Sequence, residues 1–116
     1  MSNTLQNIDD DTLVAISKFK EIVTKKYDVL SFVLFGSRAR GDHHESSDVD
    51  LAVILNTEMD DFVKVKMEMV DDAYEVFMIT NLYVQPLPIG NENDDAVYRY
   101  INPRLLNDIR EEGVEV

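Results

Sequence analysis

Two apolar runs of strand length enclose a polar stretch, and this arrangement limits what the chain can fold into more than any other feature. Val29 to Phe35 is apolar apart from Ser31, and Val49 to Leu55 is apolar apart from Asp50. Continuous apolar runs of this length, closed by glycine or polar residues, are typical of strands buried in a sheet. The sequence therefore predicts two buried strands, joined by the polar stretch from Ser37 to Ser47.

Apolar residues at helical spacing flank these strands on both sides. They predict an amphipathic helix over about 11–27, with acidic residues at its start, and a longer helix over about 61–79. The apolar positions of the first helix are Leu13, Ile16, Phe19, Val23 and Tyr27. The inner face of the second is Phe62, Val65, Met69, Ala73 and Val76. We also expect Met67, Met69 and Met78 to fill gaps in the core.

A third strand is predicted after the long helix. Leu82 to Leu87 has strand character, but this segment ends in a proline-rich stretch that contains Pro86 and Pro88. Proline has no backbone N–H, so two prolines limit how far the segment can donate to a neighbouring strand. We therefore expect an edge strand or the end of a strand.

Two short helices complete the predicted order. A helix over 94–101 precedes a last helix, which begins with Asn102 as its cap and Pro103 as its first residue. The order is α-β-α-β-α-β-α-α, and a small sheet with helices packed on it is the natural α/β (α+β) outcome. Residues 1–8 are predicted to be a flexible tail, and 9–116 a single domain.

Composition narrows the classes of function. The chain has 116 residues, 45% of them hydrophobic, which suits one packed domain and excludes disorder. It has no cysteine, so disulfides and thiolate metal sites are excluded. A net charge of −12 disfavours direct binding of nucleic acid, because phosphate contacts need a basic face. With no signal peptide pattern and no apolar run of membrane-spanning length, we expect a soluble cytoplasmic protein without membrane contact.

A phosphate-binding turn is predicted where the first strand ends. Gly36 lets the backbone approach a ligand closely, and the amides at the start of the short helix expected after it favour an anion. Ser37 adds a hydroxyl donor. Arg38 and Arg40 add positive charge and suit bidentate contacts to phosphate. Together these residues predict a site for a phosphate chain.

Two carboxylates form the second half of the motif. Asp48 and Asp50 share one face of the second strand, so their carboxylates converge. At about 5 Å and an effective dielectric near 20 they repel by roughly 3 kcal/mol, which is unfavourable without a cation. Mg²⁺ prefers such carboxylates together with phosphate oxygens, so we expect one site for metal and triphosphate. His43 and His44, between the two halves, fit no metal-ligand spacing and are interpreted as exposed loop residues.

The segment resembles the signature of the DNA polymerase β-like nucleotidyltransferase superfamily, Gly-Ser followed after ten residues by Asp-x-Asp. Phe35 to Gly41 and Ser47 to Leu51 are similar to the usual form of the minimal nucleotidyltransferases, small one-domain members of bacteria and archaea. The resemblance implies a mixed sheet and transfer of AMP from ATP with release of pyrophosphate. It implies that the Gly-Ser pair holds the triphosphate and that Asp48 and Asp50 bind two Mg²⁺ ions, one activating the acceptor and one neutralising pyrophosphate.

The chain departs from this pattern at one position. The superfamily often has a third carboxylate on the strand after the long helix, commonly serving the metal that activates the acceptor. Here Tyr83 stands where the register suggests it, and Gln85 on the same face is the other candidate counterpart. Neither is a good Mg²⁺ ligand. Nucleotide binding is therefore expected, whereas the rate of transfer is in question.

The resemblance also implies a partner. Small free-standing members are typically paired with HEPN-domain proteins, often ribonucleases, in toxin–antitoxin operons. We therefore expect an antitoxin that binds and adenylylates a HEPN toxin, on a tyrosine near its ribonuclease motif. An acidic antitoxin suits a basic RNA-cutting partner. Two alternatives stay open: a degenerate antitoxin that neutralises by binding alone, and a small-molecule nucleotidyltransferase similar to those that modify aminoglycosides.

Overall fold

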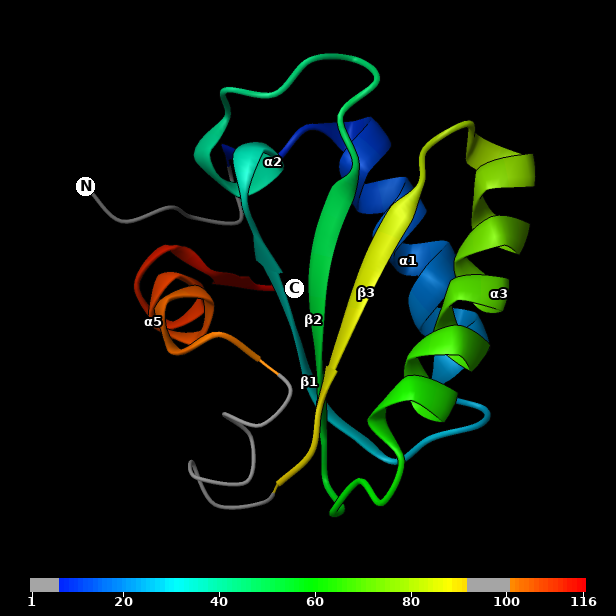
Figure 1. Cartoon of the computed structure of the whole chain (residues 1–116). Coiled ribbons are helices and arrows are strands. Elements are labelled where there is room, and N and C mark those ends of the chain that lie inside the picture. The colour runs from blue at the N-terminus through cyan, green and yellow to red at the C-terminus, as the bar shows by residue number, and fades with distance from the viewer. Residues whose placement is uncertain (1–6, 92–100) are drawn as a thin grey trace.

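A four-stranded mixed sheet forms the centre of the molecule (Figure 1). The computed structural model describes residues 7–91 and 101–116. The strands are β1 (Val29–Phe35), β2 (Val49–Leu55), β3 (Val84–Ile89) and β4 (Val114–Glu115). They lie in the order β3-β2-β1-β4, with β1 antiparallel to β2 and β4, and β2 parallel to β3. The mixed sheet is confirmed, and both predicted central strands have the predicted bounds.

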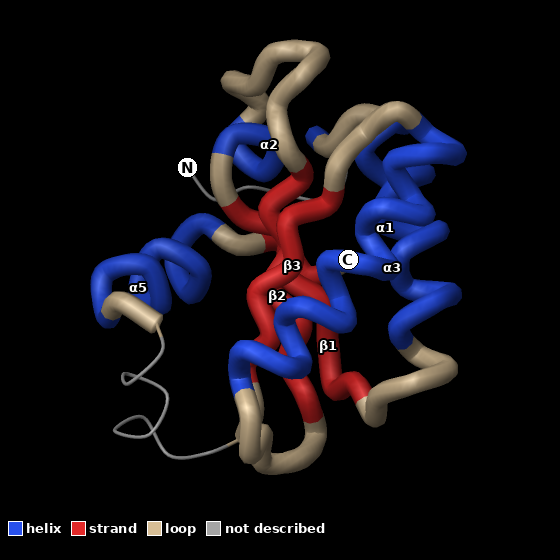
Figure 2. Tube along the Cα trace, turned by 45° about the vertical axis from the view of Figure 1, so that its right-hand side comes forward, coloured by secondary structure: helices blue, strands red, loops and turns tan. Residues whose placement is uncertain are grey.

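Helices cover both faces of this sheet (Figures 1 and 2). Helices α1 (Asp10–Val23) and α3 (Phe62–Thr80) pack on one face, where the larger apolar cluster lies. Helix α5 (Pro103–Glu112) packs on the other, over a smaller cluster. The single turn α2 (Ser37–Arg40) follows β1. Because side chains alternate along a strand, β2 sends Leu51 and Val53 toward α1 and α3 and Ala52 toward α5.

Side-chain caps fix the starts of the three longer helices. The Asp9 carboxylate accepts a hydrogen bond from the Thr12 amide at 2.8 Å, and that of Asp61 accepts from Lys64 at 3.1 Å. The Asn102 side chain accepts from the Arg104 amide at 2.8 Å. Each cap satisfies an amide that has no partner within its helix. These starts agree with the acidic and Asn-Pro signals in the sequence.

The structure differs from the predicted elements in four places. Helix α1 ends at Val23 rather than near 27, because the chain must reverse before β1. Ile8 is buried in the core rather than part of a tail. Strand β3 runs two residues later than predicted, and β4 was missed because two residues carry no periodicity. The predicted helix over 94–101 lies outside the described residues, apart from its last residue.

Two of the three methionines expected in the core lie at the surface. Met69 is fully buried, but Met67 and Met78 are 56% and 68% exposed. The prediction was wrong because α3 has apolar residues on two sides and only one side meets the sheet. Within the described part of the chain, no helix combines the length and the apolar character needed to cross a membrane.

Candidate active site

Pairing of β1 with β2 brings the two halves of the motif together. Phe35 pairs with Asp50, so Gly36 follows directly from the strand position beside that carboxylate. The Gly36 carbonyl accepts hydrogen bonds from two amides of α2, both at 3.1 Å, which closes the turn that begins at Ser37. The Gly-Ser turn and the Asp-x-Asp pair thus share one corner of the sheet, next to α2 in Figure 1.

Gly36 is shaped by the carboxylate that lies against it. Its backbone has φ 74° and ψ −157°, a region that only glycine adopts without strain. A Cβ atom at this position would lie 2.4 Å from Oδ2 of Asp50. Glycine is therefore required at this position for two reasons: its backbone conformation, and the space that the Asp50 carboxylate occupies beside it.

Asp48 and Asp50 concentrate negative charge at this corner. Asp48 is exposed and Asp50 is half-buried. Burial raises the pKa of Asp50, the charge of Asp48 raises it further, and Arg40 acts in the opposite direction. No three His, Cys, Asp or Glu side chains of residues 7–91 and 101–116 cluster as a metal site by themselves. Two carboxylates in this setting fit Mg²⁺ that completes its coordination with phosphate oxygens and water.

Gln85 is the direct neighbour of Asp50 on the next strand. The parallel register of β2 and β3 pairs the two residues, and both line the same cavity. Tyr83 lies nearer to Asp48: burial raises the pKa of its phenol and the charge of Asp48 raises it further. Of the two candidates for the missing third carboxylate, Gln85 therefore occupies the position beside the Asp50 side chain.

A cavity of about 400 Å³ opens beside the Gly-Ser turn. Gly36, Asp50 and Gln85 line it from the sheet, and the α5 residue Glu112 closes it together with Arg40. The Arg40 guanidinium is 44% exposed and lies 3.2 Å from carboxylate oxygens of Asp42 and Glu112. Arg40 thus lines the cavity beside the Gly-Ser turn, where two surface acids neutralise it, and its contact with phosphate stays a prediction.

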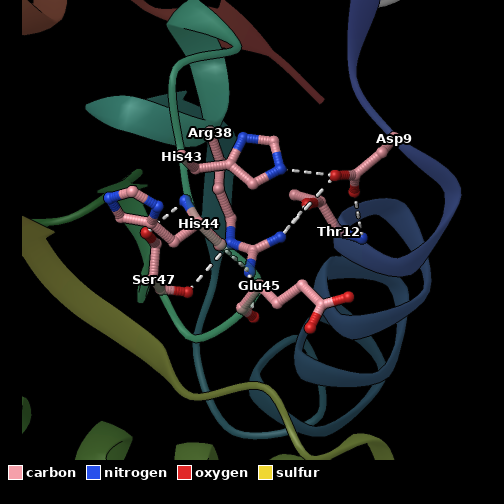
Figure 3. A network of polar contacts seen from close by, with 7 residues as sticks. All are labelled: Asp9, Thr12, Arg38, His43, His44, Glu45 and Ser47. Atoms are coloured by element: carbon pink, nitrogen blue, oxygen red, sulfur yellow. Dashed lines mark hydrogen bonds and ion pairs between the residues drawn. The ribbon is translucent and has the colours of Figure 1, made fainter.

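Arg38 points away from this cavity. Its guanidinium is buried and binds the chain itself (Figure 3). Nη1 donates to the hydroxyl of Thr12 at 2.8 Å, Nε donates to the Ser47 carbonyl at 2.9 Å, and Nη2 donates to the carbonyls of His44 and Glu45 at 3.3 and 2.9 Å. We therefore replace the predicted phosphate contact of Arg38 with a positioning role, because its donors are already used.

The polar loop between the two halves of the motif is tied to the start of α1 (Figure 3). His43 Nε2 lies 2.6 Å from Oδ2 of Asp9, and the His43 side chain is only 18% exposed. His44 is exposed, and its amide donates to the Ser47 hydroxyl at 2.8 Å. The interpretation as a fully exposed loop is thus wrong for His43. These contacts, with those of Arg38, hold the segment that leads into Asp48.

Sequence reasoning missed Thr12 and Asp9 as parts of this support. Thr12 is fully buried and lies 26 positions from Arg38 in the sequence. No spacing rule connects residues so far apart. The one available signal was the cap at Asp9, which placed both residues at the start of a helix without showing what that start would contact.

The mixed sheet and the corner that joins a Gly-Ser turn to Asp-x-Asp agree with one protein family. The chain belongs to the nucleotidyltransferase domain family, whose model matches residues 16–114. Over 38 residues it is 50% identical to a protein of Methanocaldococcus jannaschii named "Putative protein adenylyltransferase MJ1379". That segment is 33% of this chain and only 38% of the relative, well under two thirds of its length.

A solved structure shares the fold. It is a crystal structure of a toxin–antitoxin with AMP-PNP, and its similarity covers 92% of this chain and 72% of that chain with a TM-score of 0.61. The two sequences are 19% identical. This likeness shows the nucleotidyltransferase fold, and it confirms the fold class predicted from the sequence.

Proposed function

We propose that this protein is a cytoplasmic antitoxin that transfers AMP from ATP to a tyrosine of a HEPN-family ribonuclease toxin. The observation that carries the proposal is the close approach of Asp50 to Gly36, because it sets a carboxylate that could hold a metal ion against the turn expected to bind phosphates. Family membership and the name of the Methanocaldococcus relative support the chemistry. The toxin–antitoxin neighbour with its ATP analogue supports the partner and the nucleotide.

In the proposed reaction, the acceptor oxygen forms a bond to the α-phosphorus of ATP. The bond from that phosphorus to the pyrophosphate oxygen breaks, and the hydroxyl proton passes to water. Ser37 and the amides of its turn bind the phosphate chain, and Arg40 exchanges a surface carboxylate for a phosphate oxygen. Asp48 and Asp50 would hold two Mg²⁺ ions, which supply charge neutralisation at the phosphates. The contribution of the protein is mainly positioning and electrostatic stabilisation.

Charge supports a protein acceptor rather than nucleic acid. The chain carries 23 acidic and 11 basic residues, so its field repels a phosphate backbone and attracts a basic protein. A ribonuclease toxin must itself bind RNA and therefore presents basic surface. Modification of such a toxin would add a negative phosphate group where RNA has to bind, which gives a direct route to neutralisation.

The test is transfer to the purified partner. We would incubate the protein with ATP, Mg²⁺ and a HEPN-domain protein from the same genome, and weigh the HEPN protein by intact mass spectrometry. We expect a gain of one or more AMP units that disappears in the Asp48→Asn/Asp50→Asn variant. Asp10→Asn, which changes an exposed carboxylate in the first turn of α1, is the matched control and should retain transfer. No gain with the unaltered protein would refute the enzymatic proposal.

Gln85 favours one second candidate, an antitoxin that neutralises by binding alone. An amide at the position beside Asp50 is a weaker Mg²⁺ ligand than a carboxylate. In that case the Asp48→Asn/Asp50→Asn variant would still suppress toxicity in cells. Loss of suppression with the complex intact would instead favour the transferase.

A further inference from the structure

Helix α3 carries a second apolar face that is exposed in the part of the chain described, residues 7–91 and 101–116. Met69, Ala73 and Val76 pack into the core. On the other side of the helix, five apolar residues recur at alternating spacings of four and three, Val63, Met67, Val70, Tyr74 and Phe77, and Met78 lies four residues after Tyr74. Five of them are 37% to 68% exposed, and Val70 is partly exposed. We call these six the α3 stripe; spacings of this kind form the contact seam of paired helices.

The α3 stripe leads to the candidate active site. Its last aromatic residue, Phe77, lines a cavity of about 350 Å³ together with Asp48 and Tyr83. The ring of Tyr74 lies next to that of Phe77, with 6.5 Å between their centroids. The cavity that contains Gly36 is lined by three residues of α5 and, near the start of α3, by Lys66. The two cavities therefore approach the carboxylate pair from different sides, one beside α5 and one beside the end of α3.

Charges along α3 indicate what the stripe contacts. Lys64 and Lys66 lie beside the start of the stripe, whereas the exposed charges along its middle and second half are Glu68, Asp71 and Glu75. Two copies of this chain each carry a net charge of −12, so pairing through the stripe would bring two strongly acidic molecules together. Like charges that approach in this way are destabilising. A helix with basic residues beside its apolar positions complements the surface instead.

We propose that the α3 stripe is the docking surface for a helix of the acceptor protein, with apolar residues at heptad spacing and basic residues beside them. A helix seated there would end near Phe77, where the cavity opens onto Asp48. Docking would thus deliver the acceptor hydroxyl from the α3 side while the nucleotide occupies the cavity beside α5. This inference rests on the proposed function for the identity of the acceptor.

The test compares two double variants that add the same charge. Met67→Glu/Tyr74→Glu alters the α3 stripe, whereas Val14→Glu/Leu30→Glu alters exposed apolar residues of α1 and β1, 49% and 65% exposed. We would measure the dissociation constant for the purified HEPN-domain protein by calorimetry, ATP binding by fluorescence titration, and the oligomeric state by sedimentation. A third variant, Met67→Ser/Tyr74→Ser, removes the apolar contact without adding charge.

We expect both stripe variants to weaken partner binding by at least about tenfold, the loss typical of residues at the centre of an interface. ATP binding should stay unchanged, and the Val14→Glu/Leu30→Glu control should bind the partner as the unaltered protein does. Equal affinity of the stripe variants and the unaltered protein would overturn the proposal, as would an equal loss in the control. A dimer of this chain that dissociates only in the stripe variants would also overturn it, in favour of self-association.

The docking and the chemistry can fail separately. If binding depends on the α3 stripe but the unaltered protein transfers no AMP, the docking surface stands and the transferase proposal is refuted. If AMP is transferred and binding ignores the stripe, the transferase stands and the docking surface is refuted.

Discussion

Replacing Gly36 with alanine tests the site at its tightest point. The added Cβ would lie 2.4 Å from Oδ2 of Asp50, whereas ordinary van der Waals contact begins near 3.4 Å. The added Cβ is fixed to the backbone, so the Asp50 carboxylate has to move away by about 1 Å. A displacement of this size at a reacting centre lowers the rate about a hundredfold. The backbone conformation adds strain of about 1–3 kcal/mol.

These numbers predict a protein that folds but transfers AMP much more slowly. A loss of about 1–3 kcal/mol leaves most of the 5–15 kcal/mol by which a domain of this kind is stable. We expect Gly36→Ala to unfold cooperatively at a lower urea concentration, and to transfer AMP about a hundredfold more slowly at saturating ATP. The rate is measured by quenched time points and intact mass spectrometry.

Gly41 provides the matched control. It also has a positive φ, 86°, but a Cβ added there would have nothing within 4 Å. Gly41→Ala should therefore lose about 1–2 kcal/mol of stability from backbone strain while its transfer rate stays close to that of the unaltered protein. Transfer by Gly36→Ala within a few-fold of that by Gly41→Ala would refute the claim that this glycine sets the carboxylate.

Three further outcomes are expected. Arg38→Ala should lower the free energy of unfolding by about 2–4 kcal/mol, because it leaves the buried Thr12 hydroxyl and the Ser47 carbonyl without their charged donor. In the same urea titration, the free energy of unfolding of Arg38→Lys should lie between those of Arg38→Ala and the unaltered protein. Gln85→Asp should raise the transfer rate at low Mg²⁺, and an unchanged dependence on Mg²⁺ would show that this position does not serve the metal. Because the folded-state pKa of Asp50 is raised above 3.8, the stability associated with its neutral form is present below pH 3.8 and is lost as the pH rises through the folded-state pKa. Asp50→Asn should therefore unfold at a higher urea concentration than the unaltered protein at neutral pH without Mg²⁺, with the difference vanishing in acid.

The central part of the fold follows from local patterns. The strands at Val29–Phe35 and Val49–Leu55 are predictable because Gly36 closes the first apolar run and Asn56 closes the second. Helix starts are predictable because a cap acts over two or three residues, as at Asp61 and Asn102. The corner of the site is predictable for the same reason, since one strand pairing suffices to bring Gly36 to the carboxylates.

What could not be predicted depends on contacts between distant segments. Arg38 and Arg40 follow the same Gly-Ser turn and look alike in the sequence. In the structure, Arg38 is buried against Thr12, whereas Arg40 lines the cavity. Likewise, the apolar periodicity of α3 fits two faces, and only the position of the neighbouring sheet decides that Met69 is inside and Met67 outside. Charge and spacing define which interactions a residue can make, and tertiary packing selects among them.

The prolines of β3 have a consequence for assembly. The Tyr83 carbonyl accepts a hydrogen bond from the Val49 amide, so Tyr83 and alternate residues after it direct their backbone groups toward β2. Pro86 and Pro88 belong to the other set, whose backbone groups face away from the sheet, so they cost no bonds to β2. This outer margin offers few N–H donors, and another strand cannot readily extend the sheet there. The molecule is thus protected on this side against edge-to-edge pairing with the sheet of another molecule.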